Sequence, residues 1–170
     1  MTLHDKTDEM IRVNHAGEYG ATRIYAGQLF VLGNDPTIKH MAEQEQAHLD
    51  AFQRMIIERR VRPSVLQPLW YVGGFMMGAL TAMAGRNVAH ACTAAVETVI
   101  DTHYKEQMEE LSFSGDAELN DLVIKCHKDE CDHHDVVNAE AGVDLAATYP
   151  ILTSVIKRIT KTAIEIAKKI

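Results

Sequence analysis

The residues with the clearest chemical potential are two copies of a Glu-x-x-His pattern. Glu45 and His48 form the first copy, and Glu130 and His133 form the second. On a helix, positions i and i+3 lie on one face, so each copy directs a carboxylate and an imidazole toward one point. Two such pairs, each joined by a single Glu from another helix, are the ligand pattern of di-iron and di-manganese four-helix bundles. The spacing therefore predicts a dimetal site.

Two further glutamates can complete this pattern. Glu18 lies on a helical stripe with Ile11 and Tyr25, and Glu97 has Val96 and Val99 as neighbours. A carboxylate in apolar company needs a partner, because burying it alone is costly. The predicted metal ligands are Glu18, Glu45, His48, Glu97, Glu130 and His133. His134 is an alternative to His133, but it would break the i, i+3 match with Glu130.

The charge of these groups indicates which metal they would bind. Four carboxylates in an apolar core repel one another and resist ionisation. Two divalent cations balance their charge and leave both imidazoles neutral. Mixed carboxylate and imidazole ligation suits iron or manganese, whereas structural zinc sites favour Cys and His. We predict two iron ions that handle O₂, although spacing alone does not separate iron from manganese.

The elements that must position these ligands are long helices. The pattern predicts helices over about 7–32, ended by Gly33, and from Asp35 onward, with Asp35 as cap and Pro36 in the first turn. Further helices are predicted over about 88–112, with Asn87 as cap, and up to residue 141, ended by Gly142. The two halves, about 7–60 and 88–141, each place a lone Glu before a Glu-x-x-His. We predict one all-α domain over residues 1–170, a ferritin-like four-helix bundle with a dimetal carboxylate core.

The glycines of the first helix have two explanations. Gly17, Gly20 and Gly27 surround Glu18, although each interior glycine costs a helix roughly 1 kcal/mol. Their positions favour either close helix packing or space for a ligand.

Two segments indicate contact with a membrane. Residues 63–85 carry no formal charge, and their length could nominally span a bilayer. Pro68 and four glycines argue against a span, so we predict a membrane-facing crossover helix at the interface; the alternative is an ordinary buried crossover helix. The basic amphipathic helix predicted near 149–169 suits an anionic membrane surface or an acidic partner, or is a packed terminal helix.

The composition excludes several other classes. The chain has 170 residues, a net charge of −7 and 46% hydrophobic residues, so a nucleic-acid partner is not expected. Its three cysteines form no C-x-x-C, which favours a reducing compartment over a disulfide framework. The first residues show no secretion or transit signal.

Several stretches of the sequence resemble the demethoxyubiquinone hydroxylase family of ubiquinone biosynthesis. They are IRVNHAGEYGA (11–21), RIYAGQ (23–28), RP (62–63), PLW (68–70), ACTAAVE (91–97) and DECDHHD (129–135). The resemblance covers nearly the whole chain. The ligands that it implies are the same six residues reached from spacing.

This resemblance implies a membrane-bound di-iron monooxygenase. Such an enzyme hydroxylates the ring of a polyprenylated demethoxybenzoquinol with O₂, with electrons from NADH and with a lipid-binding accessory protein as partner. It implies a peripheral position on the inner membrane, on the cytoplasmic face in a bacterium or the matrix face in a mitochondrion. The chain contains no G-x-G-x-x-G, so a Rossmann-type nucleotide site does not support the NADH expectation.

The competing interpretation is a ferritin-like iron-oxidising or iron-binding protein. The uncharged segment 63–85 argues against the soluble, shell-forming surface that iron storage requires. A rubrerythrin-like peroxidase would carry paired C-x-x-C motifs, which are absent from the sequence.

Overall fold

A computed structural model describes residues 3–169, and the regular elements of this part of the chain are all helices. The helices are α1 (Leu3–Leu32), α2 (Pro36–Glu58), α3 (Gln67–Met83), α4 (Arg86–Leu111), α5 (Ala117–Ala141), α6 (Leu145–Thr148) and α7 (Pro150–Lys169). The predicted all-α class is confirmed.

The chain divides into two compact units. The first unit contains the residues up to Arg86 and those from Ala163 onward, and the second contains residues 87–162. Each predicted repeat copy, about 7–60 and 88–141, falls inside one unit.

The junction between α1 and α2 follows from local chemistry. Gly33 has φ +69°, a left-handed conformation that ends α1 at little cost. The Asp35 carboxylate then accepts hydrogen bonds from the backbone N–H groups of Thr37 at 3.1 Å and Ile38 at 3.2 Å, and it also pairs with Arg86. These contacts confirm the predicted cap and fix the start of the helix that carries Glu45 and His48.

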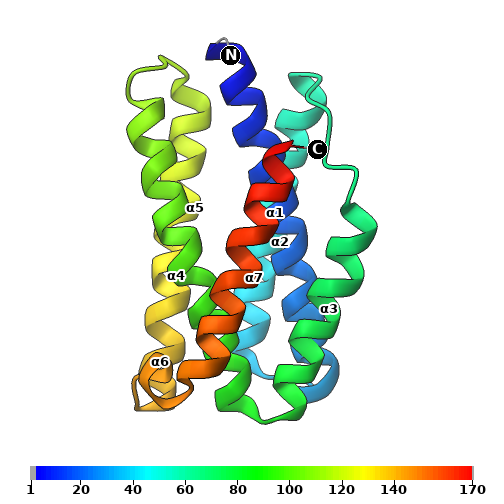
Figure 1. Cartoon of the computed structure of the whole chain (residues 1–170), viewed down its shortest axis with the longest axis vertical. Helices are drawn as coiled ribbons and strands as arrows, with labels where there is room; N and C mark the ends of the chain where they lie inside the picture. Colours follow the sequence, from blue (N-terminus) through cyan, green and yellow to red (C-terminus); the bar gives the residue numbers. More distant parts are fainter. Residues whose placement is uncertain (1–2, 170) are drawn as a thin grey trace. The chain divides into compact units, whose positions relative to one another are not determined.

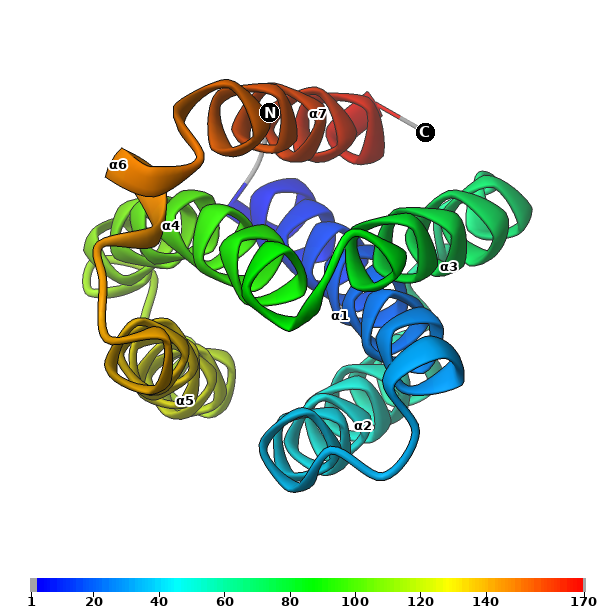
Figure 2. The same ribbon diagram turned by 90° about the horizontal axis from the view of Figure 1, so that it is seen from below.

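Helix α1 packs closely against α3 and also borders α2 (Figure 2). A Cβ atom at Gly78 would collide with the backbone of Ile24, and one at Gly74 would lie 2.7 Å from the carbonyl oxygen of Gly20. A Cβ at Gly27 would likewise meet the backbone of α3 at Phe75. Close packing therefore explains Gly27. It does not explain Gly17 or Gly20, where a Cβ would meet nothing within 4 Å.

In the second unit, α4 and α5 lie side by side (Figure 1). The buried face of α5 consists of six residues at helical spacing: Leu119, Val123, Cys126, Glu130, His133 and Val137. The helix ends at Gly142, whose φ is +66°. Helix α4 begins at Arg86, so Asn87 lies inside the first turn and is not the predicted cap. The short helix α6 was not predicted.

The last turns of α7 are tied to α1 within the first unit. Ala167 belongs to a buried cluster with Val13 and Ala16. The Arg12 guanidinium donates hydrogen bonds to the carbonyl oxygens of Ala167 at 3.3 Å and Lys168 at 2.9 Å. The end of this helix is thus a packed terminal element.

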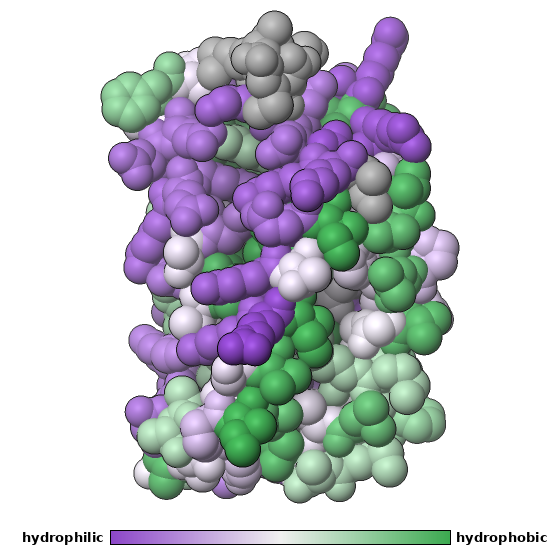
Figure 3. Space-filling view, in the orientation of Figure 1, coloured by the Kyte–Doolittle hydropathy of each residue, from purple (hydrophilic) through white to green (hydrophobic). Residues whose placement is uncertain are grey.

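Helix α3 buries one side and exposes apolar side chains on the other (Figure 3). Its buried residues include Gly74, Gly78 and Ala82, which are small. Its exposed apolar residues are Leu69, Tyr71, Val72, Met76, Leu80 and Met83, called here the α3 apolar face. Among residues 3–169, no helix combines the length and the hydropathy required to cross a bilayer. The alternative of a wholly buried crossover helix does not fit this exposure.

Candidate metal centre

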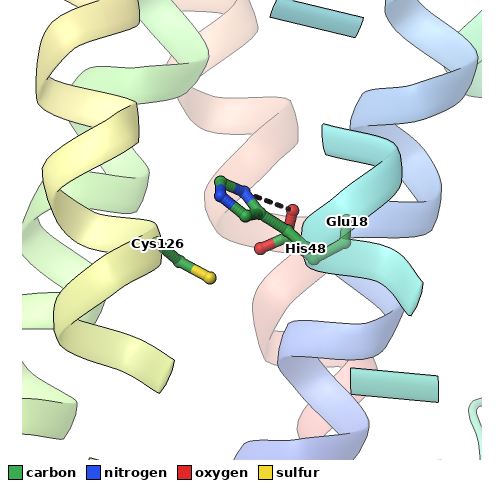
Figure 4. Close-up of side chains that lie close together, drawn as sticks. All are labelled: Glu18, His48 and Cys126. Atoms are coloured by element: carbon green, nitrogen blue, oxygen red, sulfur yellow. Dashed lines mark ion pairs between the residues drawn. The ribbon is translucent and has the colours of Figure 1, made fainter. Parts of the chain in front are cut away.

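The first unit brings three predicted ligands together. Glu18 comes from α1, and Glu45 and His48 come from the middle of the buried face of α2. Each offers a donor atom within 4.8 Å of the other two. Figure 4 shows the Glu18 carboxylate and the His48 imidazole directed toward one another, with Oε2 of Glu18 at 3.7 Å from Nδ1 of His48. We call these three residues the first ligand set.

The second unit repeats this arrangement. Glu97 comes from α4, and Glu130 and His133 come from the buried face of α5. Their donor atoms also lie within 4.8 Å of one another. Nδ1 of His133 is 3.2 Å from Oε2 of Glu130, as the i, i+3 spacing predicts. These three residues are the second ligand set.

Both sets have the composition of a transition-metal site. Each contains two carboxylates and one imidazole, and all six side chains are between 1 and 4% exposed. Two carboxylates buried this closely repel one another, and a divalent cation removes that repulsion. Oxygen and imidazole donors suit iron or manganese. The residues of each set therefore fit such a metal.

The neighbouring histidines occupy different environments. His15, on the same helix as Glu18, has its Nε2 at 2.8 Å from Oε1 of Gln53, and burial lowers its pKa despite that contact and the Glu18 charge. His15 is therefore a buried, neutral imidazole held by an amide within the core. His134 is 42% exposed and pairs with Asp135, whereas His133 is buried.

A second cluster in the second unit was not predicted. His127 and Lys105 approach the two carboxylate oxygens of Asp101, at 2.8 and 2.9 Å. Cys131 lies 3.6 Å from both Asp101 and His127. The sequence signal that could have revealed it is the i, i+4 spacing of His127 and Cys131.

The fold and the residues it gathers define a class: an all-helical protein in which each half buries a Glu, Glu and His ligand set. Residues 5–167 match the family of ubiquinone biosynthesis protein COQ7. Since the match covers nearly the whole chain, the protein belongs to this family.

The relatives carry names that agree with one another. The chain is 43% identical over 168 residues to the NADPH-dependent 3-demethoxyubiquinone 3-hydroxylase, mitochondrial, of Dictyostelium discoideum, covering 96% of this chain and 77% of the relative. It is 42% identical over 169 residues to the 3-demethoxyubiquinol 3-hydroxylase of Rhodospirillum rubrum, covering 96% and 78%. The human NADPH-dependent 3-demethoxyubiquinone 3-hydroxylase, mitochondrial, is 43% identical over 169 residues, covering 96% and 77%. The predicted family is confirmed, and these names agree with the predicted hydroxylase activity in ubiquinone biosynthesis.

Proposed function

We propose that this protein uses O₂ to hydroxylate the ring of a polyprenylated demethoxybenzoquinol in ubiquinone biosynthesis. The observation that carries the proposal is the repeated burial of a Glu, Glu and His ligand set, once in each unit. The relatives' names supply the ring substrate and the hydroxylation.

The proposed reaction centre consists of both ligand sets, which bind two iron ions in a ferritin-like four-helix bundle. Four carboxylates and two neutral imidazoles balance the charge of two divalent cations. The six side chains have no redox chemistry of their own. Bound iron would supply O₂ activation and electron transfer. The protein's contribution is to hold the donor atoms, which are at most 4% exposed, away from bulk water.

The α3 apolar face supports a peripheral position on a membrane. A polyprenyl quinol resides in the bilayer, so an enzyme that acts on it benefits from a surface that enters the interface. Exposed leucine, valine and methionine side chains beside Tyr71 match the composition of interfacial segments. The proposed location is the inner membrane, on the cytoplasmic face of a bacterium or the matrix face of a mitochondrion.

The electron source in this proposal is a reduced nicotinamide. NADH follows from the family resemblance, whereas several relatives are named as NADPH-dependent. A lipid-binding accessory protein that presents the quinol is a further part of the proposal. Both nicotinamides belong in the assay, with and without such a protein.

The deciding experiment is ring hydroxylation by the purified, iron-loaded protein with a demethoxyquinone, reduced nicotinamide and O₂. Glu97→Gln keeps the side-chain shape but removes a proposed ligand charge, and we expect product formation to fall at least tenfold, roughly the smallest loss seen even for outer-shell changes. Asp132→Asn is the matched control, because Asp132 is exposed between Glu130 and His133. Equal hydroxylation by the wild type and Glu97→Gln would contradict the proposed centre.

A further inference from the structure

A second group of metal-binding side chains lies in the second unit and shares no residue with the proposed iron ligands. It consists of Asp101 on α4 and of His127 and Cys131 on α5. All three side chains are partly buried, and their donor atoms lie within 4.8 Å of one another. Carboxylate, imidazole and thiolate are the three side-chain ligands that zinc uses in proteins.

The distances between the donor atoms match the size of a metal ion. Oδ1 of Asp101 is 2.8 Å from Nε2 of His127, and Sγ of Cys131 is 3.6 Å from each of those atoms. Zinc bonds of about 2.0–2.3 Å at tetrahedral angles separate sulfur from nitrogen or oxygen by about 3.5 Å. The two sulfur distances already have this value. Only the distance between Oδ1 of Asp101 and Nε2 of His127 must lengthen, by about 0.5 Å. The hydrogen bond between these two atoms is then replaced by a metal bond to each.

Lys105 supports this use of Asp101. Its Nζ donates a hydrogen bond to Oδ2 of Asp101 at 2.9 Å, whereas Oδ1 faces His127 and Cys131. A ligating carboxylate is commonly oriented by such an outer hydrogen bond to its second oxygen. Oδ1 is thus positioned as a single oxygen ligand.

A cysteine nucleophile activated by His127 does not fit this geometry. A nucleophile, base and orienting carboxylate form a chain through the two different ring nitrogens of the histidine. Here Asp101 and Cys131 both approach Nε2 of His127. The three groups converge on a point instead of forming a relay.

We propose that Asp101, His127 and Cys131 bind one zinc ion, which links α4 to α5 and keeps a water molecule as its fourth ligand. Asp101 follows Glu97 by one helical turn, and Cys131 directly follows Glu130, so this zinc would fix the two helices that carry the second ligand set. Binding forms a zinc–sulfur bond and releases the thiol proton to solvent, while the Nε2 proton of His127 moves to Nδ1.

Cobalt(II) added to the reduced, metal-free protein under anaerobic conditions tests this site. A cobalt–thiolate bond gives a near-ultraviolet charge-transfer absorption, which carboxylate and imidazole ligands do not give. We expect this band in the wild type and its loss when zinc is added, because zinc binds the same ligands more tightly than cobalt. Wild-type protein without the band would overturn the proposal.

Variants assign the band to particular residues. Cys131→Ser is expected to abolish it, and Cys92→Ala and Cys126→Ala, which remove the other two cysteines, are expected to retain it. A band that survives in Cys131→Ser, or that disappears only in a control, would overturn the assignment. Asp101→Asn and His127→Asn keep the thiol. Each is expected to need at least about tenfold more cobalt than the wild type to reach half of the maximal band intensity. If circular dichroism shows that Cys131→Ser does not fold, these two variants decide whether the three residues bind the metal. A cobalt concentration for half-maximal band intensity that is unchanged in both variants would contradict the site.

Discussion

At the residue scale, burial is the property that distinguishes the two ligand sets from other Glu-x-x-His pairs. On an exposed helical face, water would solvate both groups of a Glu-x-x-His, so the carboxylate would need no other partner. Here Glu45 and His48 occupy the middle of an apolar stripe that runs from Ile38 to Met55, and Glu130 and His133 occupy a similar stripe on α5. A bound cation would offset the cost of burying these carboxylates.

The choice between His133 and His134 gives a test at this scale. His133→Asn is expected to weaken iron binding at least about tenfold, because it removes a buried imidazole beside Glu130. His134→Asn is the matched control, since His134 is 42% exposed and pairs with Asp135. Iron per chain after gel filtration measures the difference. A larger loss in His134→Asn would assign the ligand to His134 instead.

The sequence predicted the residues of both ligand sets but not the cluster of Asp101, His127 and Cys131. Helical periodicity indicates which side chains face inward, so it identifies buried acids and histidines. The cluster lies at the partly exposed edge between two helices. Its contacts depend on the rotation and register of α4 against α5, which local periodicity does not determine.

At the element scale, α1 and α3 approach so closely that backbone meets backbone. Gly74 and Gly78 are four residues apart, so they lie on the same face of α3, and neither places a side chain between α3 and α1. This packing leaves the larger apolar side chains of α3 on its outer side. The glycine spacing thereby creates the α3 apolar face.

Two alanine substitutions in α3 separate packing from helix propensity. Gly78→Ala is expected to lower the free energy of unfolding by about 1–3 kcal/mol, because its Cβ would collide with the backbone of Ile24. Gly73→Ala is expected to raise it by about 0.5–1 kcal/mol, because a Cβ there meets nothing within 4 Å and alanine favours a helix. Urea unfolding measures both. Equal effects of the two substitutions would show that the close contact contributes nothing.

The start of α2 depends on Asp35 and has a predictable pH dependence. Asp35→Ala is expected to cost about 1–2 kcal/mol at neutral pH through loss of the helix cap. The hydrogen bond from Arg86, with those from the helix N–H groups, lowers the pKa of Asp35 below 3.8. A lowered folded-state pKa means that the contribution is complete above the unfolded value and is lost as the pH falls through the folded value.

Urea unfolding of metal-free wild type and Asp35→Ala, at neutral pH and in a series of increasingly acidic buffers, measures this contribution without interference from metal release. The difference between the two proteins should shrink in acid. Asp121→Ala, an exposed aspartate on α5, should show no such difference. A difference for Asp35→Ala that is unchanged in acid would exclude the charged cap as its source.

Sequence periodicity predicted most element boundaries but not every element. The ends of α1 and α5 were predictable because glycine there adopts a positive φ at little cost. Helix α6 has only four residues, which is too short for a periodic pattern. The contact of Arg12 with the end of α7 joins positions more than 150 residues apart. Local sequence patterns do not predict contacts between residues so far apart in the chain.

At the scale of the whole molecule, the α3 apolar face is the surface proposed to contact the membrane. Val72→Asp with Met76→Asp is expected to reduce binding to liposomes at least about tenfold, because both side chains are about half exposed and a charge in the interface is costly. Phe113→Asp is the matched control, since Phe113 is 86% exposed outside α3. Flotation measures the bound fraction. Retention of the double variant on liposomes would exclude this face as the contact.

The proposed joining of the two ligand sets into one centre also makes a prediction about the whole molecule. If carboxylates from both units share the two metals, then Glu45→Gln in the first set should weaken binding of both, and iron should fall below one per chain. If each set bound its own metal independently, the same variant would retain about one iron, held by the second set. Iron analysis of wild type, Glu45→Gln and Glu130→Gln distinguishes these outcomes. Glu43→Gln serves as control, because Glu43 is exposed on the same helix as Glu45 and should leave the iron content unchanged. One remaining iron in both ligand variants would contradict a shared centre while leaving two separate metal sites.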